Sequence, residues 1–422
     1  MGIVVQKFGG TSVATPQLRE RVVEHVARTL REEHQVVVVV SAMGRAGDPY
    51  ATDTLLGLAR QVGAWPAGGA SRELDLLLSC GEVIASGIMA LTLQARGLPA
   101  QALTGGQAGI ITDGTFGSAR IEEVRPDRLL ALLAEGIIPV VAGFQGVTAD
   151  GEVTTLGRGG SDTTAAALGV ALQAERVEIY TDVDGMKAAD PRLLPEAPTL
   201  QRVTYREAME MAYLGARVVH PRAVEIAMEG RVPLQIRSTV GSAPGTLVTD
   251  GLNGPGEALP REAPARADRP VRAIAHVGPR SRVWAVPARG EFDGEEIHQL
   301  FQSVAEAGVS VDMIYVAPDR LSFVVDEELG DQVREVLTRR GARFEVTSGF
   351  AKVSCVGAGM HGLPGVMARI ARALAEAGVR IYHTVDSHAN ISCLVRQEEV
   401  GTAVRALSRE FGLLESGSGG LR

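Results

Sequence analysis

The sequence has little cysteine and no surplus of positive charge, and each shortage excludes a class of protein. Its 422 residues hold three cysteines, Cys80, Cys355 and Cys393, none in a CxxC pair, and eight scattered histidines. We therefore predict no metal site and no disulfide framework, a pattern typical of a reducing cytoplasm. A net charge of −8 argues against a general binder of nucleic acid or membrane surfaces.

The sequence also predicts no targeting segment and no membrane segment. The start, MGIVVQKFGG, lacks the basic and apolar regions of a signal peptide, and we expect no run of transmembrane length. The sequence thus favours a cytoplasmic protein. With 45% hydrophobic and 22% charged residues it is globular, and its length predicts two or three domains.

Lysine is rare, which draws attention to the positions that keep it. Of 42 basic residues, only Lys7, Lys187 and Lys352 are lysine. Since arginine is the usual choice here, a lysine suggests a need for a compact ammonium, although chance explains Lys352 equally well. Lys7 follows an apolar strand and precedes Gly9 and Gly10, at the strand end where open α/β sheets bind ligands. GxxxxGK[ST] is absent, so this is not a Walker A loop.

A second glycine-rich stretch, TTLGRGGSD at 154–162, leads into an alanine-rich helix. Ser161 or Asp162 would be a natural N-cap, and a helix N-terminus attracts anions. Arg158 offers a planar fork for a carboxylate or phosphate. The stretch predicts an anion site, while an ordinary turn capping a structural helix is an equally good explanation of this stretch alone.

Strands and helices alternate through the first 248 residues, which predicts an α/β fold: an αβα sandwich with a mostly parallel sheet. The valine run 36–40 is typical of a central parallel strand, and 137–144 and 177–181 are further buried strands. Thr15 and Pro16 predict a helix start. Glu82, in ELDLLLSCGE, is either a solvated helix carboxylate or a partner for a substrate ammonium.

After residue 248 the pattern changes twice. Residues 249–270 hold four prolines, at 255, 260, 264 and 270, without apolar periodicity, so we predict a linker. The segment AEAGV then occurs at 305 and again at 375, each time between a helix and a strand. This repeat predicts two α+β modules, 271–345 and 346–422. A generic ferredoxin-like dimerisation domain is the alternative.

Several motifs in this order resemble the aspartate kinases: KFGGTS, VVSAMG, ELDLLLSCGE, GFQGV, TTLGRGGSD, IYTDVDG and ADPR. The resemblance covers essentially the whole chain. It implies an amino-acid kinase domain over 1–248 and two C-terminal ACT modules of ferredoxin-like fold. The implied reaction is MgATP-dependent phosphorylation of the β-carboxylate of L-aspartate to 4-phospho-L-aspartate. That step leads to lysine, threonine, methionine and diaminopimelate.

The resemblance also implies roles for individual residues. Because the nucleophile is a carboxylate, no general base is needed, and the task is positioning and charge neutralisation. Catalysis is expected from Lys7 and Asp162, with magnesium carried by ATP. The expected substrate-binding residues are Ser41, Thr52, Glu82, Arg158, Gly159, Gly160 and Ser161. The expected nucleotide-binding residues are Lys7, Phe8, Gly9, Gly10, Thr181, Asp182, Lys187, Arg192 and Arg217.

Two positions depart from the family pattern. Lys187 stands where the family usually has an aromatic residue, which puts adenine or ribose packing there in doubt. Arg217 replaces the lysine of GAKV and keeps the charge with a changed hydrogen-bond geometry.

Regulation is expected at the ACT modules, with lysine, threonine or diaminopimelate as effector, near Gly294 and Asp312. Acidic residues around Gly294 favour a ligand with an extra ammonium, or are solvated charges at a helix start. The acidic residues are Glu291, Asp293, Glu295 and Glu296. We expect a homo-oligomer formed through these modules.

Two other functions are alternatives to an aspartate kinase. One is an enzyme of the same fold acting on glutamate, acetylglutamate or a nucleotide, against which GFQGV and the paired modules argue. The other is an amino-acid sensor with an inactive kinase domain, which would require the loss of Lys7 or Asp162.

Overall fold

The computed structural model describes residues 1–62, 70–216, 218–250, 270–288, 290–358, 360 and 363–414. The chain forms two compact units, which are described separately below. The first comprises residues 1–186, 199–212 and 217–261, and the second comprises 187–198, 213–216 and 262–422. The predicted linker lies almost entirely at 251–269, outside the described residues.

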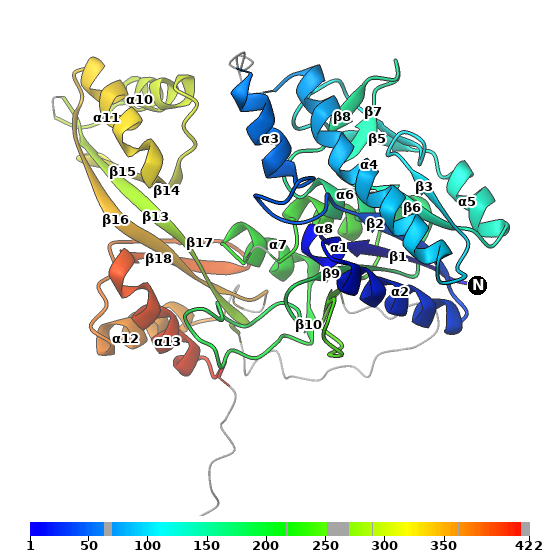
Figure 1. The fold of residues 1–422 in the computed structure, drawn as a ribbon. Coiled ribbons are helices and arrows are strands. Elements are labelled where there is room, and N and C mark those ends of the chain that lie inside the picture. Colours follow the sequence, from blue (N-terminus) through cyan, green and yellow to red (C-terminus); the bar gives the residue numbers. More distant parts are fainter. Residues whose placement is uncertain are drawn as a thin grey trace, which may run out of the picture. The chain divides into compact units, whose positions relative to one another are not determined.

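The first unit is built on an eight-stranded sheet (Figure 1). Its order is β10 (Arg202–Val203), β12 (Thr246–Val248), β11 (Leu234–Ser238), β9 (Arg176–Thr181), β1 (Ile3–Phe8), β2 (Gln35–Val40), β6 (Ile138–Ala142) and β3 (Ala100–Leu103). All neighbouring strands run parallel except β11 and β12. The prediction of an α/β fold with a mostly parallel sheet is confirmed.

Helices cover this sheet and supply its core. They are α1 (Gly10–Val13), α2 (Pro16–Arg31), α3 (Thr52–Gln61), α4 (Arg72–Gln94), α5 (Asp127–Ala134), α6 (Gly160–Ala171), α7 (Tyr205–Tyr213) and α8 (Pro221–Glu229). Thr15 caps α2 as predicted, accepting from the Leu18 N–H. The valine run forms β2, and all five valines are at most 1% exposed.

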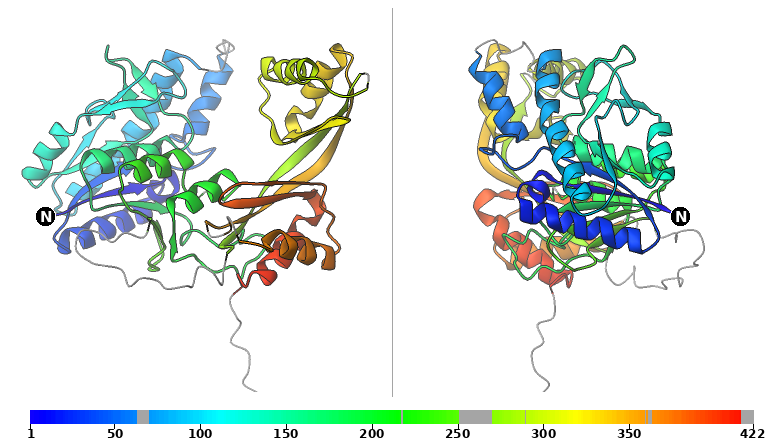
Figure 2. Two further views of the ribbon diagram at one scale, coloured as in Figure 1. Left: turned by 180° about the vertical axis from the view of Figure 1, so that it is seen from behind. Right: turned by 45° about the vertical axis from the view of Figure 1, so that its right-hand side comes forward.

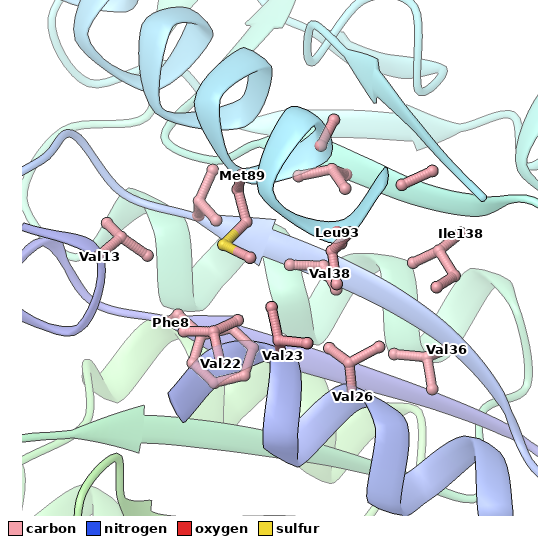
Figure 3. Close-up of a cluster of buried hydrophobic side chains, with 14 of the residues drawn as sticks. Phe8, Val13, Val22, Val23, Val26, Val36, Val38, Met89, Leu93 and Ile138 are labelled. Atoms are coloured by element: carbon pink, nitrogen blue, oxygen red, sulfur yellow. The ribbon is translucent and has the colours of Figure 1, made fainter. Parts of the chain in front are cut away.

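One core cluster joins α2, α4 and the centre of the sheet (Figure 3). Val22 and Val26 of α2 and Met89 of α4 pack against Val36 and Val38 of β2. Val36 and Val38 lie two residues apart and so share one face of β2, which packs against both helices. The carboxyl ends of β1, β2 and β9 are thereby held in register at one edge.

A four-stranded sheet that the sequence did not predict completes the first unit. Its order is β5 (Ile121–Val124), β4 (Ile110–Thr112), β7 (Gln145–Val147) and β8 (Val153–Thr155). Strand β8 ends where the TTLGRGGSD turn begins, so this small sheet supports one side of that turn.

Helix α4 corrects the expectation about membrane-length segments. By length and composition it could cross a membrane, so the prediction that no run reaches that length was wrong. Half of its most apolar window is buried inside the protein. Asp75 and Glu82 are buried on the protein-facing side, which makes α4 a core helix of this unit.

The second unit contains one six-stranded sheet shared by both predicted modules (Figures 1 and 2). Its order is β14 (Asp312–Ala317), β15 (Arg320–Asp326), β13 (Ala273–Val286), β16 (Arg343–Val356), β18 (Asn390–Arg396) and β17 (His383–Asp386). Helices α10 (Gly294–Glu306) and α11 (Gly330–Arg339) belong to one half. Helices α12 (Val366–Glu376) and α13 (Val400–Glu410) belong to the other, and short 3₁₀ turns, η1 (Glu327–Leu329) and η2 (Gln397–Glu399), precede α11 and α13.

The two modules are interleaved rather than simply consecutive. Strand β13 pairs through residues 273–277 with 352–356 of β16, and through 280–285 with β15. Each module therefore takes one half of each long strand. The domain boundaries at residues 248, 270 and 345 remain predictions. The boundary between the two halves of the sheet falls inside the long strands β13 and β16.

Residues 187–198 leave the first unit and pack within the second. Ile274 donates its N–H to Ala188 O at 2.8 Å, and His276 Nε2 lies 3.0 Å from Asp190 Oδ2. Arg405 of α13 lies 3.6 Å from Glu196. This segment, which carries Lys187 and Arg192, is thus attached to the first half of β13.

Candidate active site

The structure brings Lys7 and Asp162 together, although 155 positions of sequence separate them on different elements. Lys7 lies near the end of β1, between Val39 of β2 and Ile179 of β9. Its Nζ is 2.6 Å from Asp162 Oδ1, and each side chain is 12% exposed. A largely buried ammonium held by a carboxylate at this edge is positioned to meet a negatively charged ligand.

The turn before α6 has a different cap from the one predicted. Helix α6 begins at Gly160, and its N-cap is Gly159 with φ of 72°, so the expectation of Ser161 or Asp162 as N-cap was wrong. The physical reason is that Asp162 points elsewhere. Its Oδ1 faces Lys7 and its Oδ2 accepts the N–H of His220 at 3.2 Å.

Each of the two turns has a glycine at which a side chain would overlap neighbouring atoms. A Cβ on Gly159 would lie 2.2 Å from the ring of His220, and one on Gly10 would lie 2.3 Å from Ala42 O. The N–H groups of Gly9 and Gly160 already donate to Tyr180 O and Gly157 O. The N–H groups of Gly9 and Gly160 are therefore already used within the protein.

Glu82 is buried at the inner face of α4 and 2% exposed, so it is not a solvated helix carboxylate. Its Oε1 accepts the N–H of Ala42 at 3.0 Å, while Oε2 has no hydrogen-bond partner in the described part of the chain. Burial raises the pKa of Glu82 to about 8, and the nearby Lys7 ammonium opposes that rise. A buried carboxylate with one unsatisfied oxygen fits a cationic ligand group.

Ser41 and Thr52 flank the long loop that follows β2. Ser41 donates its N–H to Phe8 O, and Gly44 donates its N–H to Gly10 O. Thr52 is the first residue of α3. The loop therefore lies directly against the Gly9–Gly10 turn. Arg158 and Ser161 are on the facing turn, and Ser161 is 7% exposed.

The predicted nucleotide residues are divided between the two units, and the described ones of the first unit lie at or beside strand ends. The Phe8 side chain is fully buried and stacks on Tyr180 at 4.6 Å, so only its main chain faces the sheet edge. Thr181 ends β9, and Asp182 forms an ion pair with Arg45 at 2.7 Å. Arg217 lies outside the described residues.

Lys187 and Arg192 belong to the second unit. Arg192 is paired with Asp190 at 2.7 Å and is 83% exposed. The Arg192 hydrogen bonds are the main cause that lowers the pKa of Asp190 to about 2. Arg192 would therefore exchange this partner to contact a ligand.

Two residues near the site were not identified from the sequence. Arg45 lies in the loop against the Gly10 turn and pairs with Asp182. His220 contacts Gly159 and Asp162, and burial lowers its pKa. The signal for His220 was present in VVHP, where a proline opens a helix, but spacing alone does not reveal its neighbours.

At the predicted effector site, Asp293 and Asp312 have structural partners. Gly294 is the first residue of α10, and Asp293 caps it by accepting the Glu296 N–H at 2.7 Å. Asp312 Oδ2 lies 2.7 Å from the ammonium of Lys352, which is only 9% exposed. The third lysine is therefore a buried side chain in an ion pair with a partly exposed carboxylate, at the expected effector position.

Comparisons with known proteins agree with this architecture. The family model described as "Amino acid kinase family" matches residues 2–238, and an ACT domain model matches 353–411. Aspartokinase 1 of Bacillus subtilis is 44% identical over 98% of this chain and 100% of its own length. The aspartokinase of Geobacillus stearothermophilus is 40% identical over 98% of each.

Solved structures extend the likeness to three dimensions. Escherichia coli aspartokinase III in complex with aspartate and ADP aligns with a TM-score of 0.75 at 26% identity. The same protein with lysine and aspartate aligns with a TM-score of 0.76 at 27% identity. Both alignments cover 97% of this chain and 99% of the other.

The chain therefore belongs to the amino acid kinase family, with C-terminal ACT regulation. Within that family it is an aspartate kinase, which phosphorylates L-aspartate with MgATP in amino-acid biosynthesis. The alternative of a different amino-acid or nucleotide substrate is thereby set aside. The alternative of an inactive sensor is set aside by the same likeness to aspartokinases over the whole chain.

Proposed function

We propose that the sheet edge around Lys7 and Asp162 is the catalytic centre. Lys7 neutralises charge on the γ-phosphoryl group, and Asp162 holds the ammonium in place. The aspartate β-carboxylate is ionised at neutral pH and attacks without a general base. The contribution of the protein is to position two anions against each other and offset their repulsion.

Substrate aspartate is bound between the Arg158 turn and α4. Arg158 and Ser161 receive its carboxylates, Glu82 receives its ammonium, and Ser41, Thr52, Gly159 and Gly160 line the remainder. The observation that carries this assignment is the unsatisfied Oε2 of Glu82, a buried acceptor that an ammonium would satisfy.

ATP is bound at the adjoining strand ends. Lys7 and the main chain at Phe8, Gly9 and Gly10 approach its phosphates. The other nucleotide contacts are Thr181, Asp182, Lys187, Arg192 and Arg217. In the described part of the chain, no group of three His, Cys, Asp or Glu side chains is arranged to hold a metal ion. Magnesium carried by ATP would supply charge neutralisation on the phosphates, and Asp162 would orient its shell as well as Lys7.

Substitution of Arg158 tests the assignment. Arg158→Ala removes a bidentate carboxylate contact, so the aspartate KM should rise far more than the ATP KM. The readout is ATP-dependent formation of aspartate hydroxamate. Equal increases in both KM values would place Arg158 on phosphate instead.

Regulation acts through an amino acid bound at the ACT modules near Gly294 and Asp312. The related aspartokinase III has been solved in complex with lysine, which supports lysine or diaminopimelate over threonine alone. The enzyme works in the cytoplasm as a homo-oligomer of full-length chains assembled through these modules. The hydroxamate assay with each amino acid separately identifies the effector.

A further inference from the structure

Helix α4 carries a second buried carboxylate that the substrate assignment does not use. Asp75 lies seven residues before Glu82, about two helical turns, so both side chains are on the same face of α4. Asp75 is completely buried. Among the described residues it forms no ion pair with a cation, and its hydrogen bonds instead run to two chain segments.

Both oxygens of Asp75 accept hydrogen bonds from the chain that leads into the Arg158 turn. The N–H of Thr155 donates to Oδ2 at 2.7 Å, and the Thr155 hydroxyl donates to Oδ1 at 2.9 Å. The N–H of Gly117 donates to both oxygens, at 3.0 and 2.9 Å. One carboxylate therefore ties two separate backbone segments to α4.

Those two segments also hold each other and the first glycine of the turn. Ala119 donates its N–H to Thr155 O at 2.9 Å. Gly157 has φ of 73°, and a Cβ there would lie 3.1 Å from Gly117 O. Arg158 follows immediately. The start of the turn is thus enclosed between Thr155 and the loop at Gly117, both anchored on Asp75.

We propose that Asp75 is a positioning residue for aspartate binding: it fixes the Arg158 turn at a set distance from Glu82. This inference rests on the proposed roles of Arg158 and Glu82. One rigid helix thereby carries the group that meets the substrate ammonium and the anchor of the turn that meets its carboxylates. A purely structural role for Asp75 would stabilise the fold without favouring one substrate.

The test is the Asp75→Asn variant in the full-length chain, assayed for kcat and both KM values. An amide keeps the size but replaces one acceptor by a donor, which would face the N–H groups of Thr155 and Gly117. We expect the aspartate KM to rise about 10-fold to 100-fold, the range for leaving buried donors unsatisfied. The ATP KM should stay within about threefold.

Two companion variants control this measurement. Thr155→Val removes only the hydroxyl donor, and we expect a smaller rise in the same direction and a less than additive effect with Asp75→Asn. Ser86→Ala is the matched control, because Ser86 is buried on α4 and its hydroxyl donates to Val83 O within the same helix. It should leave both KM values unchanged.

Equal changes in both KM values, or a lower melting temperature with unchanged KM values, would overturn the proposal. If Asp75→Asn does not fold, Thr155→Val decides, since loss of one hydroxyl is mild. Arg158→Ala in the same assay separates the proposed role of Asp75 from the proposed role of Arg158 in binding aspartate. A selective effect in Asp75→Asn without one in Arg158→Ala would refute the role of Arg158 while leaving Asp75 as the anchor of the turn.

Discussion

At the scale of single residues, the rarity of lysine was the most useful signal of a functional position. Lys7 stood out because the chain uses lysine three times, and the structure pairs it with Asp162 at 2.6 Å. Glu82 could not be decided from the sequence, because burial depends on which face of α4 meets the sheet. Phe8 shows the opposite limit: its side chain is in the core, and only the backbone there faces the strand end.

Lys7→Arg should lose about 100-fold or more in kcat although the charge is kept. A guanidinium is wider than an ammonium and cannot occupy the same point between Asp162 and phosphate. The hydroxamate assay measures the loss. Lys352→Arg is the matched control, since Lys352 is also a buried lysine paired with a carboxylate at 2.7 Å, but in the second unit. Near-normal turnover by Lys7→Arg would refute the assigned role.

The raised pKa of Glu82 predicts how aspartate binding depends on pH. Below about pH 8 the carboxyl of the free enzyme is largely protonated, and a neutral acid pairs poorly with an ammonium. The aspartate KM should therefore fall as pH rises towards and through about 8. Glu82→Gln should show a high aspartate KM without that dependence. The ATP KM of the wild type, measured at the same pH values, is the internal control.

The raised pKa of Glu82 also predicts that the stability of the fold decreases as pH rises, whereas aspartate binding improves. The pKa of Glu82 is raised from 4.5 to about 8 on folding, so between these values the native state binds more protons than the unfolded state. Stability from this group therefore decreases as pH rises from 4.5 to 8. Without substrate, Glu82→Gln should melt at a higher temperature than wild type at pH 8, with the difference vanishing near pH 4.5. An identical difference at both pH values would contradict the shifted pKa.

At the scale of elements, long periodic segments were predictable and short ones were not. The valine strand and the helix starting at Pro16 were identified from pattern alone. The sheet formed by β4, β5, β7 and β8 was missed because its strands are three or four residues long. The cap of α6 was mistaken because the Asp162 side chain serves Lys7 and His220 instead of its own helix.

The turn before α6 should not tolerate a side chain at Gly159. Gly159→Ala would place a methyl group 2.2 Å from the His220 ring and force a left-handed backbone on alanine, so activity should fall about 100-fold. Gly159→Ala with His220→Ala removes the ring overlap but keeps the Cβ of residue 220, 2.5 Å from the new methyl group, and the backbone strain. This double variant should be more active than Gly159→Ala with His220→Phe, which keeps a ring. Gly57→Ala is the control, because its Cβ meets nothing within 4 Å. Equal activity of the two double variants would show that the ring overlap is not the cause.

At the scale of the whole molecule, the repeat of AEAGV predicted two modules but not their interleaving. Two similar segments in order suggest two separate units, whereas each of the long strands β13 and β16 serves both halves of one sheet. Strand pairing between distant residues leaves no local signal in a single sequence. The attachment of residues 187–198 to β13 was hidden for the same reason.

Full-length chains should form the oligomer without a separate regulatory subunit. The sequence has no methionine between Met228 and Met313, so no methionine codon starts a fragment at the linker. Purified enzyme should show a single chain by mass spectrometry and a multiple of its mass by light scattering. A second chain of about half the length that co-purifies would contradict this prediction.

The effector prediction can now be tested without disturbing the fold. Asp293 caps α10, and Glu296 Oε1 accepts the N–H of Ala288 at 3.0 Å. Asp293→Asn with Glu296→Gln keeps both acceptors, since asparagine caps helices as well as aspartate does, and removes two negative charges. If those charges hold the extra ammonium of lysine or diaminopimelate, the inhibition constant should rise about 10-fold while basal kcat stays unchanged.

Glu335→Gln on α11, which removes an exposed acid paired with Arg339, should leave inhibition as it was. If the double variant is inhibited like wild type, these charges serve only the helix start. Inhibition of the wild type by threonine alone, with lysine and diaminopimelate inert, would refute the choice of effector.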